Sequence, residues 1–152
     1  MARYRKVRNA SGQMGWARMV PFTYTLPIVT TALAAGSSQT LTLQIDPGLP
    51  FILYELGCAV DADGATLTNF TQWGFTILDG ESQQLFSNGE APRERMFGTR
   101  DFPRQLPSEV DISPADQLTV TAFNRTGAAQ TTTVRVTFSG YKLVGFTQAQ
   151  PE

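Results

Sequence analysis

The sequence predicts an all-β fold, namely an antiparallel β-sandwich of the jelly-roll or Greek-key type with an extended N-terminal arm. Short runs of alternating apolar and polar residues recur along the chain, and turns rich in Gly, Pro, Asn and Asp separate them about every 8–15 residues. No run shows the apolar spacing of an amphipathic helix. The chain has 152 residues, 41% of them hydrophobic, which suits one domain built around one core.

Charge divides the chain into an arm and a domain. The first 18 residues hold 5 basic and no acidic side chains, whereas the rest of the chain holds 7 basic and 13 acidic ones. The basic segment also lacks hydrophobic periodicity, so we expect residues 1–19 to form an extended arm that becomes ordered on a negatively charged surface. The β-sandwich domain is expected over residues 20–147, and a short C-terminal tail over residues 148–152.

Three strands are predicted in the first half of the domain. Residues 20–29 alternate but contain Pro21 and Pro27, which cannot donate a hydrogen bond to a neighbouring strand. We therefore expect an edge strand or an extended strap there. Residues 39–45 alternate cleanly between leucines and polar residues, which is typical of a half-buried strand. Residues 51–60 form a nearly continuous apolar run, as in a strand buried on both faces.

The second half of the domain is predicted to hold further strands and one long loop. Residues 72–78 form a strand that ends at an Asp-Gly pair, which is a hairpin signal. Residues 87–108 are irregular, and their apolar side chains indicate packing on this domain or on a neighbouring subunit. The cleanest alternation lies at residues 132–143, which we expect to pair with residues 118–123 as a C-terminal hairpin.

The residue inventory argues against catalysis. The chain has no His and a single Cys, so Ser-His-Asp and Cys-His arrangements are excluded. Cys58 stands in an apolar run and is interpreted as a small buried hydrophobe. We find no glycine-rich phosphate loop and no set of metal ligands, and we therefore predict neither an enzyme nor a cofactor. The apolar runs are far shorter than the roughly 20 residues that span a bilayer, so no membrane contact is predicted.

Two groups of residues are predicted to bind a partner. The first lies in the arm, where basic side chains surround an aromatic anchor: Arg3, Arg5, Lys6, Arg8, Trp16 and Arg18. The second lies in the long loop, where arginines alternate with aromatic rings: Arg93, Arg95, Phe97, Arg100, Phe102 and Arg104. Arginine binds carboxylates through two parallel hydrogen bonds and is common at interfaces. Five charges are few for an arm that packages nucleic acid, so we favour a protein partner over nucleic acid.

The C-terminal half resembles the small β-sandwich proteins of tailed-phage virions. The resemblance spans residues 102–140 and lies in Phe102-Pro103, Ile112–Val120, Asn124 and Val134–Gly140. It implies a head decoration or cement protein, in which a jelly roll, often trimeric, clamps neighbouring capsid subunits while a terminal arm reaches across them. The implied partners are the major capsid protein, other virion subunits and further copies of this chain. The implied location is the virion, with the capsid surface favoured, after synthesis in the host cytoplasm.

Three alternatives stay open at this point. The chain would serve equally well as a ring component of a tail, baseplate or portal vertex. A small jelly-roll coat protein would use the basic arm to bind the genome, with strongly salt-dependent affinity. A carbohydrate-binding module would need Trp73 or Tyr54 exposed for sugar stacking. Both of these aromatic residues lie within predicted strands, which favours packing in the core instead.

Overall fold

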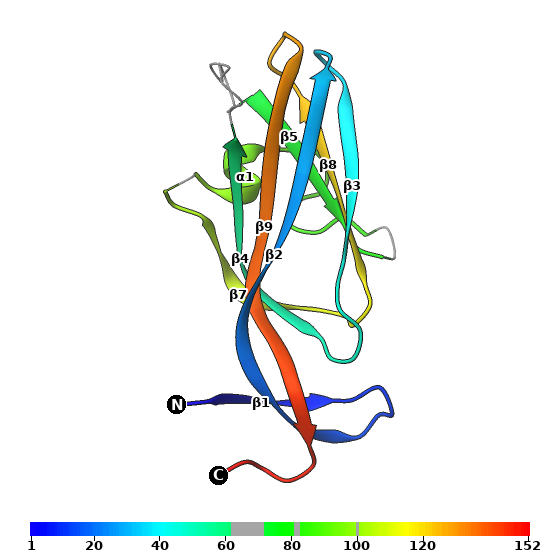
Figure 1. Ribbon diagram of the computed structural model, residues 1–152, viewed down its shortest axis with the longest axis vertical. Helices are drawn as coiled ribbons and strands as arrows, with labels where there is room; N and C mark the ends of the chain where they lie inside the picture. Colours follow the sequence, from blue (N-terminus) through cyan, green and yellow to red (C-terminus); the bar gives the residue numbers. More distant parts are fainter. Residues whose placement is uncertain (62–71, 81–82, 100) are drawn as a thin grey trace.

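The computed structural model describes residues 1–61, 72–80, 83–99 and 101–152 and shows an all-β protein with antiparallel sheets (Figure 1). The predicted all-β, antiparallel class is therefore confirmed, whereas the jelly-roll or Greek-key type stays a prediction. The described residues form nine strands and one short helix. The strands divide into a five-stranded sheet and a four-stranded sheet.

The five-stranded sheet holds the longest strands of the molecule. Its order is β1-β2-β9-β4-β7, and every neighbouring pair is antiparallel. The strands are β1 (Arg3–Arg8), β2 (Met14–Leu33), β9 (Gln130–Thr147), β4 (Phe51–Asp61) and β7 (Arg104–Ile112). Paired β2 and β9 run through the whole height of the molecule, and both chain termini lie at the end that carries β1 (Figure 1).

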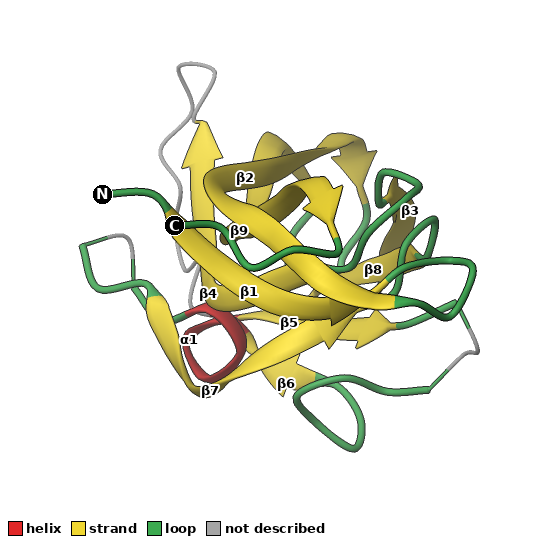
Figure 2. Cartoon of the chain, turned by 90° about the horizontal axis from the view of Figure 1, so that it is seen from below, coloured by secondary structure: helices red, strands yellow, loops and turns green. Residues whose placement is uncertain are grey.

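The four-stranded sheet has the order β3-β8-β5-β6. Its strands are β3 (Ser38–Gln44), β8 (Gln117–Asn124), β5 (Trp73–Leu78) and β6 (Ala91–Pro92). The helix α1 (Arg93–Phe97) directly follows β6 and lies beside β4, β5 and β7, as the view from below shows (Figure 2). The segment 87–108, which the sequence predicts to be irregular, thus contains β6, α1 and the first residues of β7.

The predicted C-terminal hairpin is wrong, because β8 and β9 belong to different sheets. The chain crosses between the sheets at Asn124, which is completely buried. The Asn124 side-chain amide donates hydrogen bonds to the carbonyl oxygens of Leu33 (2.9 Å) and Ala128 (2.8 Å), which holds the corner. Alternation shows which face of a strand is buried, but it does not show which strand lies beside it.

A single large hydrophobic cluster joins the two sheets; we call it the main core. It takes alternate side chains from β2, β4 and β9 on one side and from β5 and β8 on the other. Helix α1 adds Met96 and Phe97, and the ring of Phe97 meets the ring of Phe75 edge-on with their centroids 4.9 Å apart. Burying a side chain of this size contributes about 1.5–3 kcal/mol, so the main core dominates the stability of the fold.

A smaller cluster lies on the opposite face of the five-stranded sheet; we call it the second cluster. Ile52 belongs to it because residues alternate along β4, while its neighbours Phe51 and Leu53 face the main core. The other buried members come from β1, β2 and β9, and they are Val7, Ala17 and Leu143.

The five-stranded sheet curls around the second cluster until its two edge strands meet. Strands β1 and β7 stand at opposite ends of the strand order. Even so, the Arg5 guanidinium forms ion pairs with Glu109 (2.6 Å) and Asp111 (3.0 Å) of β7. These ion pairs bridge the curled sheet over the second cluster.

The extended N-terminal arm is not confirmed, because residues 3–8 and 14–19 pair as the β-hairpin of β1 and β2. The turn is held by Asn9, whose side-chain oxygen accepts hydrogen bonds from the backbone N–H groups of Ser11 (3.0 Å) and Gln13 (2.9 Å). Strand β2 passes the expected boundary at residues 19 and 20 without a break. Basic residues on both faces of β1 conceal its alternation, which explains why the sequence indicated an arm.

The prolines of β2 lie where the sequence predicted an edge. Pairing between β1 and β2 ends at Arg3 and Met19, so beyond that point β2 has only β9 beside it. Pro21 and Pro27 occupy this one-sided stretch, in which a missing N–H donor costs no ladder hydrogen bond on the open side. The predicted edge strand is thus confirmed for this part of β2.

Candidate interaction surface

The outward side of the β1–β2 hairpin gathers cations and large apolar side chains on one surface. Cross-strand pairing sets Tyr4 opposite Arg18 and Lys6 opposite Trp16, and the same face continues along β2 and β9. Because side chains alternate between the two faces of a strand, this face is the one turned away from the second cluster. Its members, which we call the hairpin face, are Tyr4, Lys6, Arg8, Met14, Trp16, Arg18, Phe22 and Val144.

A β-bulge in β9 gives the hairpin face its width. The pairing of β2 with β9 shifts between the Trp16–Thr147 and Arg18–Val144 pairs, so that one extra residue lies in β9. Gly145 stands at the bulge with φ of +67°, a conformation that glycine adopts without strain. The bulge keeps Val144 on the hairpin face and turns Phe146 to the second cluster.

The hairpin face is rich in exposed apolar surface. Tyr4, Met14, Phe22 and Val144 are between 37% and 47% exposed. Among the described residues, the other large hydrophobic side chains this exposed are Met1 and Phe102. Single exposed apolar residues are ordinary, but a group of them on one face marks a binding surface.

The cations of the hairpin face lack acidic neighbours. Lys6, Arg8 and Arg18 are exposed, and within the described part of the chain no ion pair is formed by any of them. None of the eight members of the face is acidic. The face therefore carries positive charge that is available to a partner.

A cleft of about 240 Å³ adjoins the hairpin face, between β2, β9 and the connection from β3 to β4. Its lining includes Tyr24, Lys142 and Val144. The Lys142 ammonium lies 3.6 Å from the centroid of the Phe22 ring and forms an ion pair with Asp46. The hydrogen bond from Lys142 lowers the pKa of the Asp46 carboxyl, and the same bond raises the pKa of Lys142. Unlike the cations of the hairpin face, Lys142 is already paired.

Alternation along β1 divides the predicted arm residues into two sets. Lys6, Arg8, Trp16 and Arg18 lie on the hairpin face. Arg3 and Arg5 point to the other side, where Arg3 donates a hydrogen bond to the Tyr141 hydroxyl (3.3 Å) and Arg5 pairs with β7. The latter two therefore make contacts within the domain and lie apart from the hairpin face, and their role in partner binding stays a prediction.

The predicted loop residues do not form one surface either. Phe97 is completely buried and Arg93 is 7% exposed, so both are core residues. Arg104 donates hydrogen bonds to the carbonyl oxygens of Arg95 (3.0 Å) and Met96 (3.4 Å) at the end of α1. Burial corrects the prediction for Phe97 and Arg93, whereas Arg104 is half-exposed and its role in partner binding stays a prediction.

Two members of the predicted loop set remain exposed, and one lies outside the described residues. Phe102 is 79% exposed, and the Arg95 side chain is also exposed. Arg100 lies outside the described residues. Helix α1 and its loop sit well away from β1 along the long axis of the molecule (Figure 1). The exposed loop residues and the hairpin face are therefore separate places on the surface.

Cys58 is a core residue, as the sequence predicted. It is 5% exposed and belongs to the main core. Burial raises the pKa of the Cys58 thiol to about 12, against the opposing effect of the nearby Arg93 guanidinium. The thiol is thus protonated near neutral pH and is no nucleophile there.

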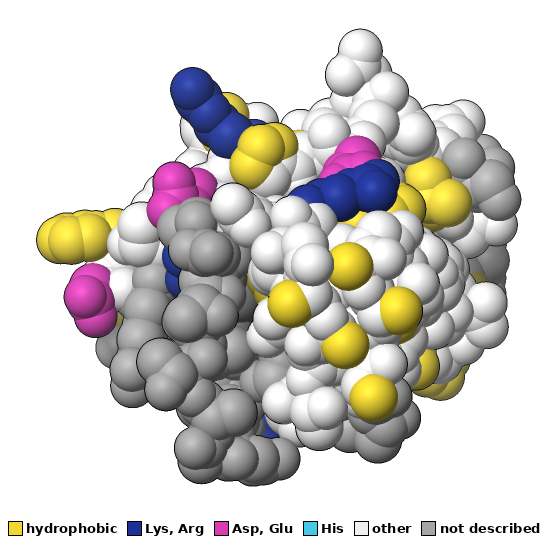
Figure 3. Space-filling model, turned by 90° about the horizontal axis from the view of Figure 1, so that it is seen from above, with side chains coloured by type: hydrophobic (Ala, Val, Ile, Leu, Met, Phe, Trp, Pro, Cys, Tyr) yellow, Lys and Arg dark blue, Asp and Glu magenta, His cyan; other side chains and the backbone are white. Residues whose placement is uncertain are grey.

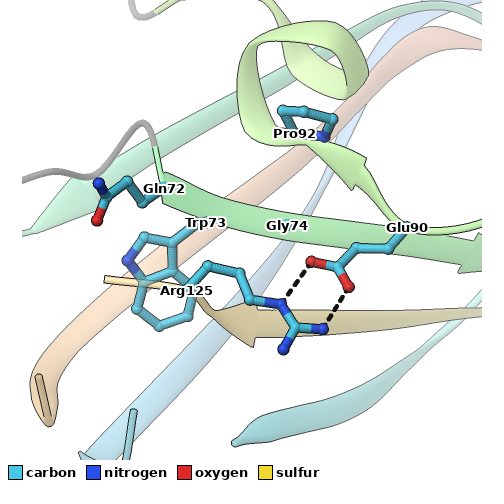
Figure 4. Close-up of a pocket in the computed structure, with 6 residues that line it drawn as sticks. All are labelled: Gln72, Trp73, Gly74, Glu90, Pro92 and Arg125. Atoms are coloured by element: carbon cyan, nitrogen blue, oxygen red, sulfur yellow. Dashed lines mark hydrogen bonds and ion pairs between the residues drawn. The ribbon is translucent and has the colours of Figure 1, made fainter. Parts of the chain in front are cut away.

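A second hollow, of about 360 Å³, lies at the β5–β6 end of the four-stranded sheet (Figure 4). Glu90 and Arg125 face each other there through two parallel hydrogen bonds of 2.9 Å and 2.6 Å. The bond from Arg125 lowers the pKa of Glu90, and the bond to Glu90 raises the pKa of Arg125. The carboxylate is already neutralised, so this hollow lacks a free acid or base.

The aromatic residues proposed for sugar stacking are not presented as a platform. Trp73 lines the same hollow but is only 1% exposed, and its predicted packing in the core is confirmed. Tyr54 is half-buried and its ring lies against that of Tyr141, with centroids 5.3 Å apart. Neither ring offers the broad open face that a sugar would need.

Figure 3 views the end of the molecule away from β1, where the charged side chains of the described residues stand at a few separate places. In the described ranges, no group of three or more Cys, Asp or Glu side chains is placed to hold a metal ion. A search of the same residues finds no helix long and apolar enough to cross a membrane.

Comparisons with protein-family models, with curated proteins and with solved structures find no match to this chain.

Four members of the hairpin face, Tyr4, Met14, Phe22 and Val144, were not among the predicted site residues. A signal for two of them exists in the sequence. Tyr4, Lys6 and Arg8 follow one another at every second position, as do Met14, Trp16 and Arg18, on either side of an Asn-Ala-Ser-Gly turn. This spacing is that of a two-stranded hairpin with one mixed cationic and apolar face. The sequence signal for Val144 is weaker, because only Gly145 indicates the bulge that places Val144 on this face.

Proposed function

We propose that this chain is a non-enzymatic structural protein of a phage virion, which binds and stabilises the assembled capsid as a decoration or cement protein. The hairpin face is the surface that contacts the neighbouring capsid subunit. In this proposal the two sheets act as a sandwich of the jelly-roll type, and the hairpin takes the place of the extended arm. The resemblance of residues 102–140 to such proteins supports a role in the virion, and the hairpin face supports a contact with another protein.

The observation that carries the proposal is the composition of the hairpin face. It combines tyrosine, tryptophan, phenylalanine, methionine and arginine and contains no acid. These residue types are enriched in the centres of protein interfaces, where aromatic and arginine side chains provide most of the binding energy. A face of this kind fits an acidic, partly apolar patch on another protein.

A protein partner is favoured over nucleic acid for a specific reason. Met14 is 47% exposed and Val144 is 37% exposed, and aliphatic side chains of this kind seek apolar contacts. Bases of single-stranded nucleic acid would instead stack on open aromatic rings, and Trp16 is half-buried. Binding to the genome is therefore the second candidate, and a gel shift with single-stranded DNA tests it.

The expected mechanism is thermodynamic. A protein that binds the assembled shell but not its free subunits stabilises the shell by mass action. At a free concentration 100 times the dissociation constant, each bound copy contributes about 2.7 kcal/mol. No chemical step is needed, which agrees with the absence of histidine.

The test is co-sedimentation with purified capsid shells that lack this protein. The variant K6E/R8E/R18E reverses the charge of the three unpaired cations of the hairpin face. We expect its affinity for capsid shells to fall by at least about tenfold, because the new glutamates repel an acidic partner. The matched control pair is R18E and R95E, since both change one exposed arginine and only Arg18 lies on the hairpin face. Truncation of residues 1–18 is unsuitable because it removes β1 and buried Ala17.

Four outcomes would count against the proposal. Equal binding of wild type and K6E/R8E/R18E to capsid shells would show that the hairpin face is not the contact surface. Absence of the chain from virions, measured by mass spectrometry, would remove the virion role. If an antibody against this protein labels the tail or the portal vertex of virions, the protein is a ring component and not a capsid decoration protein. A gel shift with single-stranded DNA that depends steeply on salt would favour the genome-binding alternative.

A further inference from the structure

Strand β3 is the open edge of the four-stranded sheet, and it lacks the features that usually keep sheet edges apart. Among the described residues it pairs with β8 alone, and it lies beside β2 without pairing with it (Figure 1). Its sequence, Ser-Gln-Thr-Leu-Thr-Leu-Gln, contains no charge and no proline. Exposed edges of this kind pair readily with another strand, and proteins normally protect them with charges, prolines or short length.

The strands at the other ends of the two sheet orders, β1, β7 and β6, and the one-sided stretch of β2 are protected in these ways. Strand β1 carries four cations, and the one-sided stretch of β2 contains two prolines. Strand β7 contains Pro107, Glu109 and Asp111. Strand β6 has two residues, and beyond it the Leu85 N–H donates to the Ile77 carbonyl (2.8 Å) and covers the edge of β5. The contrast singles out β3.

The backbone of β3 presents a regular set of donors and acceptors to the open side. The Ser37 carbonyl accepts from the Asn124 N–H and the Ile45 N–H donates to the Asp116 carbonyl, each at 2.9 Å. In an antiparallel pair, the residues that exchange hydrogen bonds with the neighbour alternate along the strand. The odd-numbered residues of β3 therefore face β8. The backbone groups of Ser38, Thr40, Thr42 and Gln44 face the open edge.

We infer that β3 pairs with β3 of a second copy of this chain, antiparallel and about a two-fold axis at Leu41. This register pairs the whole strand, because Thr40 meets Thr42 and Ser38 meets Gln44 of the second copy. It also matches even-numbered residues with even-numbered ones, as the outward backbone groups require. The two four-stranded sheets then join into one continuous sheet. The inference does not depend on the proposed function.

The side chains of β3 fit the same register. Thr40 and Thr42 already form hydroxyl contacts with Thr121 (2.8 Å) and Thr119 (3.4 Å) of β8. The second copy extends this row of threonines across the junction, and threonine pairs across strands are favourable. Leu41 and Leu43 pack on the main core but remain half-exposed at the edge, and a second strand covers them. No like charges meet, since β3 has none.

The experiment is the solution mass, by light scattering on a sizing column, of wild type and two variants that differ by one residue. We expect wild type to have twice the 16.6 kDa of one chain. The variant T40K/T42K sets lysines opposite lysines across the axis and should be monomeric. The variant T40K/T42E sets each lysine opposite a glutamate and should remain dimeric. Circular dichroism of all three proteins checks that the fold is retained.

Hydrogen exchange keeps the inference testable if a variant fails to fold. In the wild-type dimer, the amides of Thr40 and Thr42 should be protected and should lose protection on dilution, because they point to the junction and not to β8. Fast exchange of these amides in a dimeric sample would place the interface elsewhere and overturn the inference. A wild-type monomer would also overturn it, as would a dimer of T40K/T42K. A trimer would overturn it while leaving the proposed function intact, because a two-fold contact cannot close a ring of three.

Discussion

The main core and the second cluster stabilise the same five-stranded sheet in different ways. Among the described residues the main core buries 21 side chains drawn from both sheets, whereas the second cluster buries four drawn from a single curled sheet. Apolar burial alone accounts for the stability of the main core. The second cluster also relies on pairing of β2 with β9 and on the Arg5 ion pairs at its rim. The hairpin face thus sits on the less deeply anchored part of the molecule, as is common for binding elements.

The largest effect should come from the main core. Replacing Phe75, which is completely buried against Phe97, with alanine leaves a cavity and should lower the free energy of unfolding by about 3–5 kcal/mol. Urea unfolding followed by circular dichroism measures it. Labelling of Cys58 by a thiol reagent, which is slow in the native protein because the thiol is buried, should become faster as the whole domain opens. A loss under 1 kcal/mol would contradict the dominance of the main core.

A smaller and more local effect is expected in the second cluster. Leu143 is 7% exposed, and L143A should cost about 2–3 kcal/mol, near the lower end for buried leucines. Hydrogen exchange should show lost protection in β1 and the first part of β2, with little change in β5 and β8. Cys58 labelling should stay slow under conditions in which the hairpin opens. Equal loss of protection in both sheets would show that the two clusters unfold as one unit.

The smallest effect is expected from the Glu90–Arg125 ion pair beside the main core. The pKa of Glu90 is lowered from its ordinary value of 4.5 by the hydrogen bond from Arg125. Its stabilising contribution is therefore present above pH 4.5 and is lost as the pH falls through the lowered pKa. The midpoint of thermal unfolding of E90Q should lie about 1–3 °C below that of wild type at pH 7, because the pair is partly exposed.

Melting temperatures at acid pH test whether the Glu90–Arg125 ion pair causes this difference. Wild type and E90Q should converge in melting temperature once the pH has fallen below the lowered pKa of Glu90, where this carboxyl is protonated in both the folded and the unfolded chain. The control E94Q changes an exposed carboxylate of α1 that forms no ion pair within the described residues, and it should track wild type throughout. A difference between wild type and E90Q that persists unchanged at low pH would show that something other than the ion pair is lost.

Part of the fold and part of the candidate surface were accessible from local pattern. The strands at residues 39–45, 51–60 and 72–78 correspond closely to β3, β4 and β5, because alternation and apolar runs report burial directly. Lys6, Arg8, Trp16 and Arg18 were identified by charge and residue type. Phe97 was assigned to an interface although it is buried, because an aromatic residue among arginines gives the same sequence pattern in a core and in an interface.

By itself, the sequence determined the all-β class, the burial of Cys58 and Trp73, and the edge position of Pro21 and Pro27. Each of these follows from properties of a residue and its near neighbours, such as alternation, side-chain size or a missing N–H group. Only the tertiary structure decided that β8 and β9 enter different sheets, that Arg5 bridges to β7, and that the basic segment is a hairpin. These outcomes depend on which distant strands pair. Pairing is decided by the fit of whole sheets around a shared core, and local pattern does not encode that fit.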